Sequence, residues 1–319
     1  MPTLSVRHAD RRAAQSVVPP APSAIDLHSH TIHSDGLLTP TALVEAAAAS
    51  GVRLFSITDH DTLAGLRALT APGAPPLPPG LELVPGVEIN AVTRPGEPLR
   101  GEIHVLGLGV DPADEAFEAA LAGQRAERLR RFLAIVERLR EIGMPIDEDL
   151  AGLDLTDDHA LGRPTIARIL VARGHAESVD DAFVRLLGGG GPAYVPRAGL
   201  GPIEAVRAIR SAGGLPVLAH YAEAPERPDV IGELIEAGLG GLEAYHRSFD
   251  APTAAALATF AAGRGLVPTG GTDYHGDVGT YAEAHAGLHV PPDVGPALRE
   301  AVLAASVSRP TRGPAPPRG

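Results

Sequence analysis

The stretch AIDLHSHTIHSDGLLTPTALVEAAAASGVRLFSITDH, residues 24–60, holds two short apolar runs that flank an alanine-rich segment. The two runs have the length and composition of buried strands. Between them, Thr39 as a cap, Pro40 in the first turn and Gly51 after the last turn predict a helix that starts at Thr39-Pro40 and ends at Gly51. A strand, a helix and a second strand make one β/α unit, so this stretch predicts an α/β protein with a parallel sheet.

The same alternation continues along most of the chain. Apolar runs predict strands at 24–28, 53–60, 81–89, 102–110, 215–221, 241–247 and 266–276. Segments of helical period predict further helices over PIEAVRAIRSAGG, near 229–237 and at 251–262. At least seven strands favour a barrel of β/α units over an open sheet.

The strand pattern is interrupted between residue 112 and about residue 200, where the period is helical throughout. Within this segment, GGGGP at 188–192 predicts a hinge or turn. We interpret the interruption as an inserted helical subdomain that forms a lid. The expected organisation is a disordered tail at 1–23, a barrel made of 24–111 and 201–308, the lid at 112–200 and a disordered tail at 309–319.

The composition excludes several kinds of chemistry. The 319 residues include no cysteine, which excludes disulfide scaffolds, thiol catalysis and iron–sulfur clusters. They also include no lysine, which excludes Schiff-base chemistry and a lysine-dependent phosphate loop. A net charge of −12 argues against binding to duplex DNA or an anionic membrane. Without a signal-peptide pattern or an apolar run of membrane length, we expect a cytoplasmic protein.

Histidines and carboxylates recur at the ends of the predicted strands. A single histidine is more often structural than a ligand, but seven of the 13 histidines lie within or just after a predicted strand. His28 and His30, two residues apart on an extended chain, lie on one side and can reach the same ion. The candidate ligands are His28, His30, Asp35, His60, Glu88, His104, His220, Asp273 and His275. This number exceeds what one metal ion needs, so the sequence predicts a cluster of ions.

Such a cluster indicates a reaction. Imidazole and carboxylate ligands favour Mn²⁺, Fe²⁺ or Zn²⁺. Closely packed cations need bridging carboxylates, for which Glu88 and Asp273 are the natural candidates. A multinuclear site activates water at neutral pH, orients a phosphoryl group and stabilises the attacking and leaving oxygens. The pattern therefore predicts hydrolysis of a phosphate ester.

Taken in order, HSHTIHSDG, ITDHDT, PGVEI, His104, AHY and GTDYHG resemble the motifs of the polymerase and histidinol phosphatase (PHP) family over residues 25 to 276. The resemblance implies a distorted (β/α)7 barrel and three divalent metal ions, with Mn²⁺ expected first and Fe²⁺ or Zn²⁺ as alternatives. It implies a first ion held by His28, His30, Glu88 and Asp273, a second by Glu88, His104 and His220, and a third by Asp35, His60 and His275.

Within the family, the chain resembles the branch with a helical insertion, which includes 3′,5′-nucleotide bisphosphate phosphatases and a 5′-to-3′ oligoribonuclease. The shared segments are GRPT at 162–165 and LLGGGGPAYVP at 186–196, although Thr165 replaces the usual histidine. The resemblance implies that the substrate is a small phosphorylated nucleotide or a short 5′-phosphorylated RNA. Another small phosphomonoester, such as histidinol phosphate, and a PHP fold that has lost catalysis are the alternatives.

Three further residues are candidates for handling the substrate. Arg163 has the geometry for bidentate pairing with a phosphate, and the alternative is a salt bridge to a helix carboxylate. His246 and Arg247 close a predicted strand, where they would bind the leaving oxygen or protonate it. The helix between Gln124 and Glu141 carries six arginines and three glutamates, which we interpret as an exposed helix with pairs of opposite charge rather than a guide for polyanions.

Overall fold

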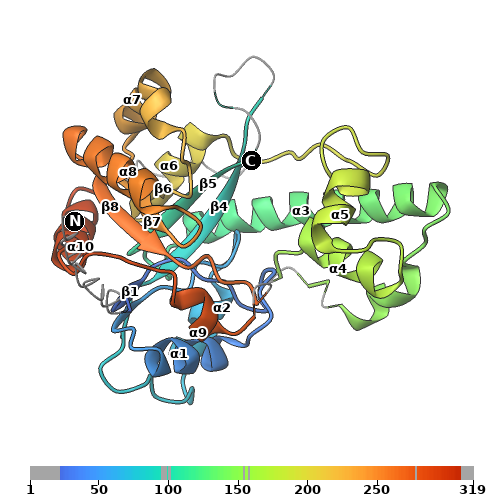
Figure 1. Ribbon diagram of the computed structural model, residues 1–319, viewed down its shortest axis with the longest axis horizontal. Coiled ribbons are helices and arrows are strands. Elements are labelled where there is room, and N and C mark those ends of the chain that lie inside the picture. The colour runs from blue at the N-terminus through green and yellow to red at the C-terminus, as the bar shows by residue number, and fades with distance from the viewer. Residues whose placement is uncertain are drawn as a thin grey trace, which may run out of the picture.

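The computed structural model describes residues 22–94, 99, 102–153, 155–156, 159–276 and 279–309. Their strands form a three-stranded sheet, in the order β1-β2-β3, and a five-stranded sheet, in the order β4-β5-β6-β7-β8 (Figure 1). The strands are β1 (Ile25–Asp26), β2 (Leu54–Phe55), β3 (Glu82–Leu83), β4 (Gly86–Val92), β5 (Glu102–Leu108), β6 (Leu215–Leu218), β7 (Gly241–His246) and β8 (Val267–Gly271). Every run predicted to be a strand contains an observed one, which confirms those predictions.

The expectation of a parallel sheet is wrong at β5. This strand is antiparallel to both neighbours: Glu88 of β4 lies opposite Leu106, and Leu106 lies opposite Val217 of β6. The physical reason is the connection between β4 and β5, which contains only residues 93–101. A crossover between parallel strands needs a dozen residues or more, whereas this short connection suffices for antiparallel neighbours.

The helices account for the remaining elements that the structure describes. They are α1 (Pro40–Ala49), α2 (Ala64–Thr70), α3 (Glu115–Glu141), α4 (Arg163–Ala172), α5 (Val179–Ala182), α6 (Pro202–Ser211), α7 (Pro228–Ala237), α8 (Ala251–Gly263), α9 (Tyr281–His285) and α10 (Val294–Val307). Shorter turns are η1 (Asp147–Gly152), η2 (Phe183–Leu187) and η3 (Ala224–Glu226). The first predicted helix is confirmed, because Thr39 Oγ1 accepts from Ala42 N (3.2 Å) and Gly51 has a φ of +93°.

Backbone hydrogen bonds join the two sheets on both sides. Leu27 N, after β1, donates to Gly270 O of β8 at 3.1 Å. Glu88 N of β4 donates at 3.2 Å to Asp59 O, in the chain that continues from β2. These bonds bring the loops after β1, β2 and β8 next to β4, and those loops carry most of the predicted ligands.

The five-stranded sheet is packed on both faces. Val105 of β5 belongs to one apolar cluster with Ile209 of α6, and the next residue, Leu106, belongs to another with Leu298 of α10. Successive residues of a strand point to opposite faces, so β5 contributes to both clusters. Both layers hold the sheet rigid beneath the loops at its end.

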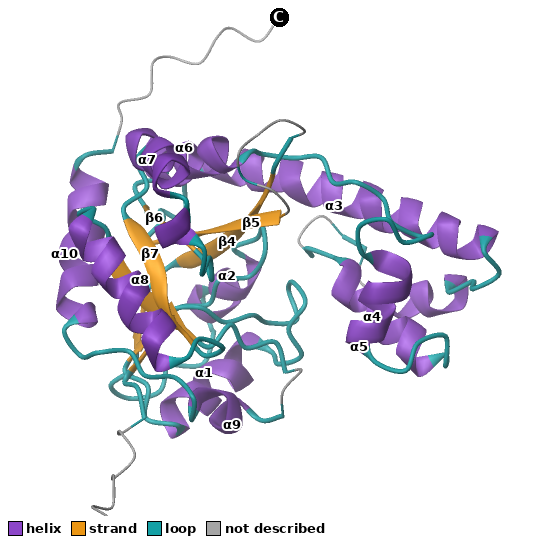
Figure 2. Ribbon diagram, turned by 45° about the horizontal axis from the view of Figure 1, so that its top comes forward, coloured by secondary structure: helices purple, strands orange, loops and turns teal. Residues whose placement is uncertain are grey.

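Residues 112–200 contain no strand among those described, which confirms their predicted helical period. At its start, α3 packs Phe117 and Leu121 into the core beside the sheet. Further along, Phe132 and Leu139 pack with Leu170 of α4 in a separate core. Figures 1 and 2 show α4 and α5 beside the outer part of α3, away from the sheets. Their role as a lid stays a prediction.

Most of each expected tail, 1–21 and 310–319, lies outside the described residues. At their inner ends, Ser23 Oγ donates to Ile25 O (2.7 Å) and Arg309 pairs with Asp111 (3.2 Å). These two residues are therefore held by the fold, contrary to the expected tail boundaries. In the part of the chain that the structure describes, no helix has the length and apolar character to cross a membrane.

Candidate metal centre

The nine predicted ligands converge on one place. Three groups of side chains have their ligand atoms within 4.8 Å of one another: His28, His30, Glu88 and Asp273; His30, Asp35, His60 and His275; and His60, Glu88 and His104. His220 joins the last group, because its Nε2 lies 3.1 Å from His104 Nδ1 and 3.4 Å from Glu88 Oε1. The first group has the same members as the first ligand set implied by the resemblance. The others share His30 and His60 in addition.

Backbone pairing brings the ligand-bearing loops side by side. Ser29 forms an isolated bridge with Tyr274, and each of these residues lies between two predicted ligands. His60 forms a second isolated bridge with Glu88. Residues far apart in sequence are thus registered to each other by main-chain contacts, which fixes where their side chains meet.

The backbone is strained at this place. Among the described residues, the only non-glycine residues with a positive φ are Asp61 (52°), His220 (31°) and Asp273 (48°). Each such residue costs about 1–3 kcal/mol, and such strain tends to cluster at functional sites. All three follow a strand or its continuation, so the strain turns their side chains or those of their neighbours toward the centre.

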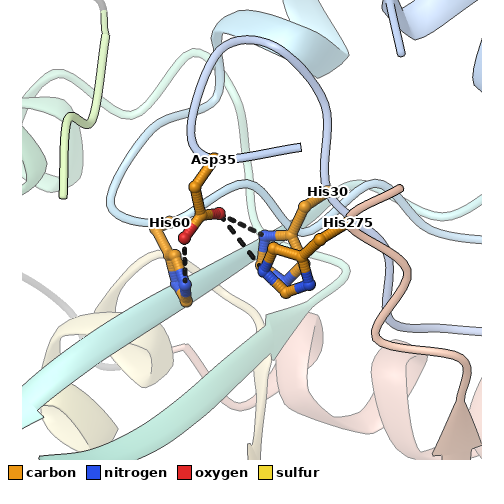
Figure 3. Close-up of side chains that lie close together, drawn as sticks. All are labelled: His30, Asp35, His60 and His275. Atoms are coloured by element: carbon orange, nitrogen blue, oxygen red, sulfur yellow. Dashed lines mark ion pairs between the residues drawn. The ribbon is translucent and has the colours of Figure 1, made fainter. Parts of the chain in front are cut away.

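Asp35 lies between three histidines (Figure 3). Its Oδ2 is 3.6 Å from His60 Nε2, and its Oδ1 is 3.2 Å from His275 Nε2 and 3.8 Å from His30 Nδ1. The rings of His30 and His275 stack with 4.1 Å between their centroids. The loop after β1 therefore presents a carboxylate across the gap between strands that are not neighbours in sequence.

Glu88 occupies the middle of the cluster and is fully buried. Its Oε2 lies 3.3 Å from His28 Nε2, 3.2 Å from His30 Nε2 and 2.9 Å from His60 Nδ1. Its other oxygen, Oε1, lies 2.8 Å from His104 Nδ1. One carboxylate thus reaches ligand atoms of all three groups through two oxygens, as a bridging ligand does.

The donor set fits metal ions. Within the described part of the chain, these buried atoms face the centre without a hydrogen-bond partner: His28 Nε2, His30 Nε2, His60 Nδ1, His246 Nε2, Asp35 Oδ1 and Glu88 Oε2. Buried polar atoms of native proteins are nearly always satisfied, and an ion is one way to satisfy them. The clusters have the composition and spacing of a multinuclear metal site.

The carboxylates of the centre stay ionised. Burial alone would raise the pKa of Asp35, but nearby histidines, His60 foremost, outweigh burial and hold it well below its usual range. The same competition between burial and histidine charge holds the pKa values of Glu88 and Asp273 well below their usual ranges, with His28 as the largest opposing charge. The site therefore presents permanent negative charge.

The histidines respond unequally to this charge. Burial alone would lower the pKa of His28, yet Glu243 and Glu88 raise it well above its usual value. Burial opposes the same change at His275, where Asp35 helps to raise the pKa to about 10. At His60 burial prevails and lowers the pKa to about 4. Without metal, protons on some imidazoles balance part of the charge that cations would balance.

Glu243 is a site residue that the sequence analysis missed. It is fully buried in β7; its Oε1 lies 3.0 Å from His28 Nδ1, and its Oε2 accepts from His220 N (2.8 Å). A carboxylate on the remote nitrogen of a ligating histidine fixes the tautomer and the ring orientation. The available signal was an ionisable residue inside the otherwise apolar strand GLEAYH.

Two aspartates beside predicted ligands support the loops. Asp59 accepts from Thr31 N (2.7 Å) and so fixes the start of the loop that carries Asp35. Asp26 accepts from Thr272 N (2.9 Å), one residue before a predicted ligand of the last strand. Their carboxylates are engaged with the backbone, which suits support rather than metal binding.

Asp61 binds arginines. It is fully buried, and its Oδ2 accepts from Arg128 Nε (2.5 Å) and Arg197 Nη2 (2.7 Å). Burial would raise its pKa, but the two guanidiniums outweigh burial and lower it. The interpretation of α3 as an exposed helix is wrong at Arg125 and Arg128, which are only 5% and 6% exposed. That face of α3 is turned toward the centre.

A cavity of about 470 Å³ lies over the cluster. Besides predicted ligands, it is lined by four arginines, Arg128, Arg131, Arg163 and Arg197, and by three phenylalanines, Phe132, Phe183 and Phe249. Its size is in the range of small-molecule sites, roughly 300–1,000 Å³. Cationic and aromatic walls above clustered ligands suit a molecule that combines phosphate with a flat ring.

The three candidates for substrate handling lie around this cavity. Arg163 begins α4, with its guanidinium 5.2 Å from the centre of the Phe183 ring. His246 ends β7, and its Nε2 lies 3.5 Å from Asp273 Oδ2. Arg247 lines a neighbouring cavity. All three are near the cluster, while their roles stay predictions.

Known proteins resemble this chain over most of its length, although no family model matches it. It is 33% identical to a 3′,5′-nucleoside bisphosphate phosphatase of Chromobacterium violaceum, over 79% of this chain and 87% of that protein. It is 34% identical to a phosphoribosyl 1,2-cyclic phosphate 1,2-diphosphodiesterase of Eggerthella lenta, over 83% of this chain and 98% of that protein.

A third relative is matched over a shorter region. The chain is 39% identical to the 5′-3′ exoribonuclease Rnm of Salmonella typhimurium, over 61% of this chain and 64% of that protein, which is less than two thirds of its length. Among solved structures, a protein of Bifidobacterium adolescentis assigned as a metal-dependent phosphoesterase superposes with a TM-score of 0.73 and 32% identity. That match covers 89% of this chain and 98% of the other.

Proposed function

The chain belongs to the PHP-like metal-dependent phosphoesterases, and from this premise we propose that its substrates are phosphate esters of nucleotides. The protein is a phosphoric ester hydrolase, as its family is. We propose that it removes the 3′-phosphate of 3′,5′-bisphosphonucleotides and trims short 5′-phosphorylated RNA from the 5′ end. Two relatives carry these activities in their names, the bisphosphate phosphatase and the exoribonuclease.

The observation that carries the proposal is the arrangement of the cavity. Nine ligands for divalent cations lie beneath it, while its walls hold four arginines and three phenylalanines. Arginine pairs with phosphate through its planar fork, and aromatic rings stack on nucleobases. The complete ligand set also argues against a PHP fold that has lost catalysis.

We propose that three divalent ions, Mn²⁺ first with Fe²⁺ or Zn²⁺ as alternatives, are held by the three ligand sets described above. Bound there, they would activate water and balance the charge of the phosphoryl oxygens. Glu88 would bridge them, and Glu243 would hold His28 in register. We also propose that the two sheets together form the distorted barrel that the family resemblance implies.

His246 has the geometry of a proton donor. Ser248 N donates to His246 Nδ1 (3.3 Å), so a neutral ring carries its proton on Nε2. This Nε2 is buried in the cavity wall and has no hydrogen-bond partner among the described residues. A protonated ring nitrogen cannot bind a metal ion, but it can give its proton to a leaving oxygen.

The arginines have the geometry to hold a second, non-reacting phosphate. Arg128 and Arg197 are both fixed by Asp61, so their guanidiniums are oriented before substrate binds. Arg163 is steadied by the ring of Phe183. Prepaid orientation of this kind favours a substrate with phosphates on both sides of the ribose, as in a 3′,5′-bisphosphate.

The test compares four substrates with one preparation of the Mn²⁺-loaded protein: adenosine 3′,5′-bisphosphate, a short 5′-phosphorylated RNA, histidinol phosphate and phosphoribosyl 1,2-cyclic phosphate. We expect the highest kcat/KM for the first two. His28→Ala and Asp273→Asn should abolish turnover, whereas His246→Gln should retain the metal and lose turnover. Preference for either of the last two substrates would overturn the proposal.

A further inference from the structure

A second cavity, of about 580 Å³, adjoins the candidate metal centre. Asp273 and His275 line both this cavity and the one described above. Pro164 and Phe183 also line both, so the two cavities are separated by the start of α4 and the turn after α5. A phosphoryl group at the ligands therefore has space on two sides.

The two sides differ in chemistry. His246 lines the first cavity, and Arg247 lines the second. If His246 protonates the leaving oxygen, the leaving group occupies the first cavity, which also holds the phenylalanines and four of the arginines. The second cavity is then left for whatever else is attached to the phosphorus atom.

The walls of the second cavity suit a nucleotide. Arg168 and Arg247 provide positive charge, against one carboxylate, Asp180, that is not a predicted ligand. Two large apolar side chains, Leu37 and Val179, line it from opposite walls while remaining 53% and 36% exposed. Exposed apolar surface beside cationic groups matches a base and a backbone phosphate.

The helical wall is tied to the centre itself. Arg168 of α4 donates from Nη2 to the backbone oxygen of Asp35 at 2.7 Å. Leu37 lies two residues after Asp35 in the same loop. The second cavity is therefore positioned by the same loop that brings a predicted ligand to the cluster.

We propose that the second cavity binds the nucleotide on the 3′ side of the scissile phosphate, which makes the protein able to cleave RNA as well as bisphosphates. The inference rests on the proposed function. A water oxygen bonds to phosphorus, the bond from phosphorus to O3′ breaks, and O3′ takes the proton of His246. The phosphoryl group stays on O5′ of the downstream nucleotide, which leaves through the second cavity. With adenosine 3′,5′-bisphosphate, the same step releases inorganic phosphate and the second cavity stays empty.

The experiment compares adenosine 3′,5′-bisphosphate with the 5′-phosphorylated dinucleotide of adenosine, in Mn²⁺-loaded wild type and three variants. Val179→Glu and Leu37→Glu each place a negative charge in the second cavity, from opposite walls. Because like charges repel the downstream phosphate, the ratio of kcat/KM for dinucleotide to kcat/KM for bisphosphate should fall about tenfold or more in both. Val184→Glu is the matched control, since Val184 is 83% exposed on the same turn, and its ratio should equal that of wild type.

The outcomes separate two failures. If wild type hydrolyses neither substrate, the proposed function is wrong. If it hydrolyses the bisphosphate but not the dinucleotide, or if both cavity variants keep the wild-type ratio, the assignment of the second cavity is wrong. Use of two walls guards against misfolding of one variant, because the ratio is read within each protein that still hydrolyses the bisphosphate.

Discussion

Neighbouring residues of this chain have different tasks although they share a chemical type. Asp59 supports a loop, His60 faces the cluster and Asp61 holds two arginines, all within three positions. The alternation of side chains along an extended chain separates them, because each points away from the next. The motif ITDHDT is therefore one support, one proposed ligand and one anchor for the cavity wall.

Glu243 is expected to set the orientation of His28. Replacing Glu243 by glutamine removes the carboxylate that faces His28 Nδ1, and loss of such a partner typically lowers metal affinity about 10–100-fold. Titration of the metal-free variant with Mn²⁺, with bound metal measured directly, checks this. Glu233→Gln, on the partly exposed surface of α7, is the control. An unchanged affinity in Glu243→Gln would contradict the role.

The charge balance predicts a dependence of stability on pH. In metal-free protein the pKa of His275 is about 10, against 6.5 for the free side chain. A raised pKa stabilises the fold below pH 6.5, and this contribution is lost as pH rises toward 10. The Tm of wild type minus that of His275→Gln, both in chelator, should therefore decrease between pH 6.5 and 9. The increase in Tm caused by Mn²⁺ should grow over the same window, since metal binds neutral imidazole.

Thermal unfolding of both proteins at several pH values is the measurement. A Tm difference that grows with pH would show that His275 is not held protonated by Asp35 and Asp273.

The elements of this fold were predictable because their signals are local. A cap, a proline and a terminal glycine define α1 within a dozen residues, and apolar runs of strand length define the sheet. The pairing was less predictable: β5 is antiparallel because of the length of its connection. Glu243 and Arg197 escaped prediction for a related reason, since Glu243 lies 215 positions from His28 and Arg197 lies 136 from Asp61.

The contact between β8 and the chain after β1 leaves no room for a side chain at Gly271. A Cβ added there would lie 2.4 Å from His28 Cβ and 2.6 Å from His28 N. Gly271→Ala must therefore shift a proposed ligand, and overpacking of this kind destabilises by about 1–3 kcal/mol. Gly263→Ala is the control, because nothing lies within 4 Å of its added Cβ at the end of α8. Urea unfolding and metal content together check both; a Gly271→Ala protein with wild-type stability and metal would contradict the account.

Across the whole molecule, Asp61 joins the helical segment to the sheets. It follows β2, while Arg128 comes from α3 and Arg197 from the chain before α6. Asp61→Asn removes the charge that both guanidiniums share, and breaking such a buried pair costs about 3–5 kcal/mol. Asp147→Asn is the control, since its ion pair with Arg140 is exposed and contributes about 0–1 kcal/mol. Equal free energies of unfolding for the two variants would show that Asp61 does not join these parts.

The account depends on several cations sharing one site built from distant parts of the chain. Elemental analysis after dialysis of the metal-free protein against Mn²⁺ measures this. We predict close to three ions per chain in wild type, as the three ligand groups require, and fewer in Glu88→Gln, which alters the residue common to two of them. One bound ion or none in wild type would contradict a multinuclear centre and the phosphate-ester chemistry built on it.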